Sequence, residues 1–204
     1  MKRIVLFAAT VVMLGTHDPA VAADPRYPDW PCAQIKVPEL SVAAMWAGPP
    51  IDDVGNGWEN DPQIKDLVAA LALRRTPLEQ AEKTISEFLA ADAATRQGKA
   101  KLLFAGLFVT LNRERSEVMN GIERFSRRQV DFAERLRAKA YQLRELQDAP
   151  GHDQAKVDEL ADAINWDTRI FEEQRKTIRY VCEVPTAIEQ RVFALARTIQ
   201  QSLE

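Results

Sequence analysis

Apolar residues recur at alternating spacings of three and four through residues 99–203, the pattern that one face of an α-helix produces. Two such segments flank a turn at residues 148–153, where Pro150 and Gly151 reverse the chain. The pattern predicts an all-α protein built on a long antiparallel helical hairpin. Its sustained period, near 3.5 residues, is typical of a coiled coil. The first stripe comprises Phe104, Phe108, Leu111, Val118, Ile122, Phe125, Phe132, Leu136, Leu143 and Leu146, and the second comprises Val157, Leu160, Ile164, Phe171, Ile178, Val181, Ile188, Val192, Leu195 and Ile199.

The turn also sets which residues of the two arms face each other, because the numbers of facing residues should sum to about 303. Gln129 then lies opposite Gln174 at a core position, where two amides can satisfy each other's hydrogen bonds. One polar layer of this kind commonly fixes the register. The same rule pairs Phe125 with Ile178, Phe132 with Phe171 and Leu143 with Leu160.

Three charged residues also fall on the core stripe. Lys139 and Arg115 are predicted to extend their charged ends toward the rim of the hairpin. Asp167, opposite Leu136, has no favourable partner under this register. These positions are therefore the weakest points of the predicted core.

An arm from residue 101 to residue 146 would be roughly 70 Å long. We therefore expect either that other helices cover only the base of the hairpin, or that the arms break at Val184-Pro185. Pro185 is also compatible with the first residue of a new helix. Gly106 and Gly121 either weaken the first arm locally or allow another helix to approach it closely.

The chain before the hairpin predicts an extended arm followed by two short helices. Residues 24–60 are rich in proline and carry Trp30, Trp46 and Trp58, which indicates an extended segment packed onto the core. Asp61 is a suitable cap for a helix over residues 61–74, and Thr76 with Glu79 has capping-box spacing for a second helix. These helices would complete a four-helix bundle at the base, within a helical domain spanning residues 61–204. Asp52 to Asn60 resembles a calcium loop only in part, since Val54 and Gln63 occupy ligand positions, so we favour a glycine turn.

Residues 1–23 have the three parts of a secretory signal peptide: a basic start, the apolar run 4–15 and a small-residue cleavage site before Asp24. The apolar run is too short for a transmembrane helix, and no cysteine follows the cleavage site. We therefore expect a periplasmic protein without a transmembrane segment in its mature form. In that oxidising compartment the two cysteines, Cys32 and Cys182, are predicted to form a disulfide.

Composition offers little for catalysis or ligand chemistry. A net charge of −3 gives no basic excess for nucleic acid, and His152 is the one histidine after the signal segment. That histidine count excludes a His-rich metal site, a Ser-His-Asp triad and bis-His haem ligation within one chain. We therefore expect no enzyme, no metal site and no cofactor.

The remaining hypothesis is a non-enzymatic interaction protein, an adaptor, accessory or chaperone-like subunit that presents its hairpin to an envelope protein. The layout is similar to that of small exported helical chaperones and assembly factors of the bacterial envelope. One alternative is a ligand-binding bundle with an apolar pocket lined by Phe104, Phe108, Phe193 and a tryptophan, and another is a structural homodimer. The candidate partner contacts are Arg127, Arg128, Arg135, Arg137 and His152.

Overall fold

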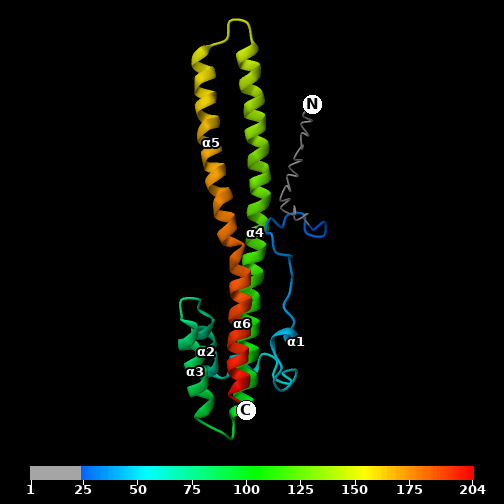
Figure 1. The fold of residues 1–204 in the computed structure, drawn as a ribbon, viewed down its shortest axis with the longest axis vertical. Helices are drawn as coiled ribbons and strands as arrows, with labels where there is room; N and C mark the ends of the chain where they lie inside the picture. Colours follow the sequence, from blue (N-terminus) through cyan, green and yellow to red (C-terminus); the bar gives the residue numbers. More distant parts are fainter. Residues whose placement is uncertain (1–23) are drawn as a thin grey trace, which may run out of the picture.

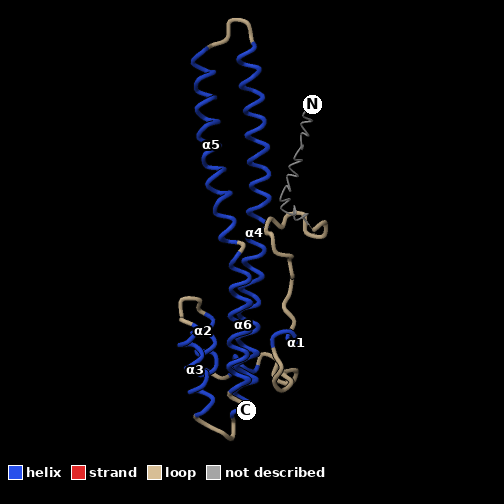
Figure 2. Tube along the Cα trace, viewed as in Figure 1, coloured by secondary structure: helices blue, strands red, loops and turns tan. Residues whose placement is uncertain are grey.

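The computed structural model describes residues 24–204; the predicted signal peptide lies outside them. The long helix α4 forms one arm of an antiparallel hairpin, and α5 followed by α6 forms the other (Figures 1 and 2). Two shorter helices, α2 and α3, pack at the base, and the N-terminal segment runs in mostly extended form beside α4. The all-α hairpin with helices at its base is thus confirmed. The elements are α1 (Val42–Met45), a 3-10 helix η1 (Gly57–Asn60), α2 (Pro62–Ala72), α3 (Leu78–Ala90), α4 (Arg96–Asp148), α5 (Gln154–Val181) and α6 (Glu183–Gln201).

The hairpin reverses where the sequence predicts it. Helix α4 ends at Asp148, and Gly151 adopts a positive φ of 71°, a conformation that costs glycine little. Asp153 then caps α5, its carboxylate accepting a hydrogen bond from the N–H of Ala155 at 3.1 Å. The turn therefore uses a glycine and an acidic cap to join the two arms.

The second arm is interrupted two to three residues before the predicted Val184-Pro185 position, and Cys182 at the interruption keeps helical backbone angles, with φ −63° and ψ −21°. Helix α5 ends at Val181 and α6 begins at Glu183, so the break lies at Cys182. Pro185 is buried in the first turn of α6. The first turn is where a proline fits a helix, because the N–H groups there have no partner within the helix.

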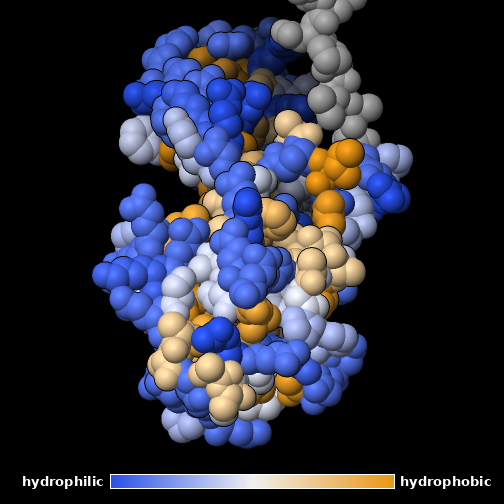
Figure 3. All heavy atoms as spheres, turned by 60° about the horizontal axis from the view of Figure 1, so that its bottom comes forward, coloured by the Kyte–Doolittle hydropathy of each residue, from blue (hydrophilic) through white to orange (hydrophobic). Residues whose placement is uncertain are grey.

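The base bundle, defined as α2, α3, α6 and residues 96–122 of α4, contains the main core. Helix α2 packs against α4, and α3 packs against α6. Trp46 and Trp58 of the N-terminal segment belong to the same core. Seen obliquely from the base, apolar residues appear at the surface as separate patches among hydrophilic side chains (Figure 3). The largest completely buried apolar side chains are Phe104, Ile64, Leu71, Ile85, Leu89, Leu103, Leu107, Leu111, Ile122, Ile188 and Leu195.

The two short helices begin differently. Asp61 caps α2 as predicted, accepting hydrogen bonds from the N–H groups of Gln63 and Ile64 at 3.0 and 3.1 Å. The capping box predicted at Thr76 is wrong: its hydroxyl donates to the carbonyl of Ala70 at 3.1 Å, and α3 begins at Leu78. The carbonyls at the end of α2 lack partners within the helix, so the Thr76 hydroxyl serves one of them instead.

Gly106 and Gly121, both in α4, have different surroundings. A Cβ atom on Gly106 would lie 2.7 Å from Val68 and 2.8 Å from the Trp58 ring, so this glycine allows close approach of α2 and η1. A Cβ atom on Gly121 would meet nothing nearer than a flexible Arg124 nitrogen at 3.8 Å. Of these two glycines, only Gly106 is closely packed against a neighbouring element.

Opposite effects on stability follow for the two alanine substitutions. Gly106→Ala is expected to lower the free energy of unfolding by about 1–2 kcal/mol, since overpacking against the Trp58 ring outweighs the better helix propensity of alanine. Gly121→Ala, the matched control on the same helix, should raise it by up to about 1 kcal/mol. Urea denaturation of both variants measures the difference, and equal shifts of the same sign would contradict the packing assignment.

Candidate functional site: the distal hairpin

The N-terminal segment is held at the break between α5 and α6. Cys32 and Cys182 form a disulfide with a Cα–Cα distance of 5.6 Å, confirming the pairing. Trp30 is buried against Met119 and Ile122, and its indole N–H donates to the carbonyl of Gln34 at 2.8 Å. The side-chain amide of Gln34 in turn donates to the carbonyl of Cys182. The break in the second arm is therefore a docking point for the segment.

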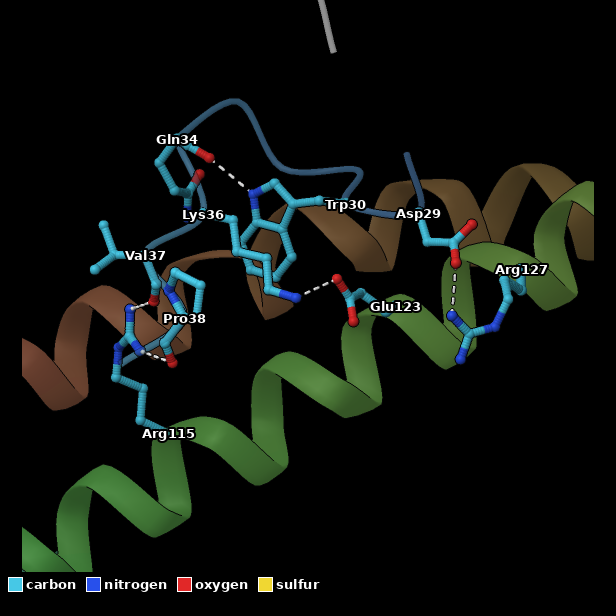
Figure 4. Close-up of polar contacts among 9 residues, drawn as sticks. All are labelled: Asp29, Trp30, Gln34, Lys36, Val37, Pro38, Arg115, Glu123 and Arg127. Atoms are coloured by element: carbon cyan, nitrogen blue, oxygen red, sulfur yellow. Dashed lines mark hydrogen bonds and ion pairs between the residues drawn. The ribbon is translucent and has the colours of Figure 1, made fainter. Parts of the chain in front are cut away.

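Ion pairs attach the same segment to α4 on either side of Trp30 (Figure 4). Asp29 accepts from Arg127 at 2.6 Å, and Lys36 pairs with Glu123. The Lys36–Glu123 pair is largely buried, whereas the Arg127–Asp29 pair is about half exposed. Exposed pairs contribute little, so the disulfide and the buried contacts carry most of the attachment.

Arg115 corrects the sequence prediction, because its side chain does not extend to the rim. It is 2% exposed, and its Nε donates to Glu189 of α6 at 2.6 Å. The other two nitrogens donate to backbone carbonyls of the N-terminal segment, those of Val37 at 2.6 Å and Pro38 at 3.3 Å (Figure 4). The N-terminal segment passes over α4, covers this guanidinium and supplies two of its hydrogen-bond acceptors. The helical pattern of α4 alone does not reveal this contact.

Arg191 of α6 plays a comparable structural part that sequence reasoning missed. Its Nε and Nη2 donate to the carbonyl of Leu71 at 2.9 and 2.6 Å, and its Nη1 donates to that of Thr76 at 3.0 Å. Burial lowers the pKa of Arg191 from its ordinary value. A cation at the C-terminal end of α2 suits the negative end of the helix dipole, so the residue joins α6 to the α2–α3 turn.

We define the distal hairpin as residues 123–181. In the described chain, the last buried residue of α4 is Ile122, and Val157 is the one buried residue of α5. Residues 123–148 of α4 thus extend about 40 Å beyond the core. This half of the hairpin is a two-helix structure whose apolar seam is only partly covered.

The two arms of the distal hairpin meet in the register that the turn predicts. The amide Nε2 of Gln129 donates to Oε1 of Gln174 at 2.5 Å, and the Phe132 and Phe171 rings pack edge to face at 5.7 Å. The register therefore places these pairs as expected. The sequence register gave Asp167 no favourable partner. In the structure its carboxylate accepts a hydrogen bond from the Lys139 ammonium at 2.7 Å. That ion pair explains how two charged core-stripe residues are accommodated at the half-exposed rim.

The predicted partner contacts are spread over the distal hairpin rather than gathered in one cluster. Arg128 and Arg137 are exposed, and Arg135 lies over the Phe132 ring at 5.4 Å. Arg127 is paired with Asp29, and His152 lies exposed in the turn between the arms. These arginines are therefore accessible to a partner, but the structure does not gather them into one binding patch.

A groove that the sequence did not predict opens beside the disulfide, with a volume of about 660 Å³. We call it the arm groove. Residues 31–34 of the N-terminal segment close its lower end, and α4 and α5 form its sides. Its α4 side includes Phe125, Ser126, Gln129, Val130 and Ala133, and its α5 side includes Phe171, Arg175, Ile178 and Arg179. The heptad pattern placed Phe125 opposite Ile178, but it gave no sign that residues 31–34 would close one end.

Of the aromatic residues proposed for a ligand pocket, Phe104, Phe108 and Trp46 pack together within the main core, and Phe193 does not belong to that core. Phe104 is 1% exposed and stacks on Trp46, with ring centroids 4.2 Å apart, and Phe108 packs beside it. Phe193 of α6 is 52% exposed. Phe104 and Phe108 therefore serve as core residues of the base bundle, and Phe193 faces outward.

The stretch compared with a calcium loop forms turns leading into η1. Asp53 pairs with Lys101 at 2.5 Å, and the hydrogen bond from that ammonium lowers the pKa of the carboxyl. Within residues 24–204, no three His, Cys, Asp or Glu side chains are grouped to hold a metal ion. In the same range, no helix is both long enough and apolar enough to cross a membrane.

Comparison with protein families, with curated proteins and with solved structures found no match for this chain.

Proposed function

We propose that this chain is a non-enzymatic interaction protein of the bacterial envelope, in which the base bundle supports the distal hairpin and the distal hairpin contacts a protein partner. The signal-like residues 1–23 and the Cys32–Cys182 disulfide support export to the periplasm. An adaptor or chaperone-like role fits a protein that offers a long helical surface.

One observation carries the proposal. The deep core ends at Ile122, yet the two arms continue for about 40 Å with a seam that stays partly exposed. Large apolar side chains remain at the surface there: Val130, Tyr141, Trp166 and Tyr180 are 56–70% exposed. A two-helix extension of this kind adds little to the core, so binding to a partner is the use that best explains it.

The distribution of lysines provides a direct test. Native mass spectrometry of the protein isolated from its host's periplasm is expected to show a stoichiometric protein adduct. Lysine-specific cross-linking of that complex should then join the partner to lysines of the distal hairpin and not to those of the base bundle. The distal lysines are Lys139, Lys156 and Lys176, and the matched exposed lysines of the base are Lys65 and Lys83.

Absence of a protein adduct, or cross-links confined to Lys65 and Lys83, would contradict the proposal. A small bound mass in place of a protein would favour a ligand-binding bundle instead. Lys65 and Lys83 are exposed as well, so a lack of cross-links to them would not result from poor accessibility to the reagent.

A further inference from the structure

We infer that the arm groove receives an acidic amphipathic helix of the partner, which lies along α4 and α5 as a third helix. This inference rests on the proposed function and specifies both where the partner binds and its chemistry. It follows from the floor of the groove, from the size of the side chains along its edge and from its charge.

The floor of the groove is apolar and incompletely covered. Phe125, Phe171 and Ile178 are partly buried where the arms meet, and Val130 beside them is 56% exposed. Burying such a surface under a further apolar stripe is favourable, and a helix is the element that fits a groove between two helices.

Beyond the groove, toward the turn, the seven-residue spacing places small side chains along the same edge of the hairpin. Ser126 and Ala133 line the groove on α4, and the same seven-residue step leads to Ala140 nearer the turn. On α5, Arg175 also lines the groove. Successive steps of seven residues from Arg175 toward the turn reach Thr168 and Ala161. Small residues allow two helix axes to approach to about 8–10 Å.

The opposite edge of the hairpin differs in character. By the same register it carries Arg128 and Arg135 on α4, and neither lines the arm groove. On α4, long charged side chains hinder close helix packing along that edge, whereas Ser126, Ala133 and Ala140 do not along the other. The small-residue edge therefore leaves room for a third helix beside α4.

The charge of the groove favours an acidic occupant. Arg175 and Arg179 both line it, and within residues 24–204 neither forms an ion pair. Glu183 is the one acidic residue of the lining. Carboxylates flanking an apolar stripe would pair with the two arginines.

Two labelled probe peptides of about 18 residues test the inference on the full-length oxidised protein. They share a leucine stripe, and one is flanked by glutamates and the other by lysines. Fluorescence anisotropy is expected to show the acidic probe binding at least about tenfold more tightly. The double variant Arg175→Glu/Arg179→Glu should weaken that binding at least about tenfold, whereas Arg113→Glu/Arg197→Glu, with the same charge change at exposed positions of the base bundle, should alter it less than about twofold.

Two tryptophan variants test the groove by steric blocking, independently of charge. Ala133→Trp fills the groove and should abolish binding of the acidic probe, while Ala138→Trp, an equal change at an exposed position of α4, should leave it intact. Thermal melting confirms that each variant folds. Equal binding of the two probes, no binding of either, or equal effects of the two tryptophans would overturn the inference.

Two further results separate this inference from the proposed function. If Ala133→Trp retains the native adduct with its distal cross-links, the groove assignment fails and the proposed function stands. If the wild-type protein sediments as a dimer that Ala133→Trp dissociates, a second copy occupies the groove and the inference of an acidic partner helix is wrong.

Discussion

The double variant Cys32→Ser/Cys182→Ser is expected to lose up to about 5 kcal/mol in the free energy of unfolding, the largest effect we predict. The bond closes a loop spanning 150 residues, and a loop of that length greatly restricts the unfolded chain. In the folded state, the variant keeps the Trp30, Lys36 and Arg115 contacts, so we expect the fold to remain. Urea denaturation followed by circular dichroism measures the loss.

Reduction provides the control for this prediction. Wild-type protein treated with a thiol reductant should unfold at the same urea concentration as the double variant, because both lack the same cross-link. A variant that unfolds at the wild-type midpoint would show that the disulfide adds nothing to the free energy of unfolding, contrary to this prediction.

Arg115→Met is expected to lower the free energy of unfolding by about 3 kcal/mol. The change leaves the Glu189 carboxylate without its partner and removes the donor from the carbonyls of Val37 and Pro38. Breaking a buried pair commonly costs about 3–5 kcal/mol, and Glu189 is 31% exposed, which places the effect near the lower end. Equilibrium urea denaturation gives the value.

A second variant, Arg115→Met/Glu189→Leu, tests how much of the lost stability comes from the unpaired Glu189 carboxylate. Removing both charges should recover part of the loss, because no unpaired carboxylate remains, while the two backbone carbonyls still lack their donor. Hydrogen exchange should also show faster opening of residues 37–40 in both variants. Wild-type stability of Arg115→Met would mean that the guanidinium does not hold the segment to α4.

Much of the helical architecture follows from local pattern. The apolar stripe, the turn at Gly151 and the Asp61 cap each depend on neighbours within a few residues, and all are found where predicted. The register follows from the same turn, which is why Gln129 and Gln174 meet. Helix boundaries were less predictable: Pro185 lies in the first turn of α6, and the helical arm is interrupted before it, at Cys182.

The candidate site was less accessible to sequence reasoning. The exposed arginines of α4 were evident from the charge pattern, but the arm groove was not. It forms because residues 31–34, some 90 positions before Phe125 in sequence, are fixed beside α5 through Cys182. Seven-residue spacing placed Ser126, Ala133 and Arg175 along the helices, yet nothing local showed that one edge of the hairpin would border a groove.

The sequence by itself determined the all-α class, the hairpin, its register and the pairing of its two cysteines, because helical periodicity is local and two cysteines allow one intramolecular pair. The tertiary structure alone decided where Arg115 and Arg191 find their acceptors, why Gly106 is required, and where the groove lies. Those features depend on side chains and carbonyls brought together from distant parts of the chain, for which no local pattern exists.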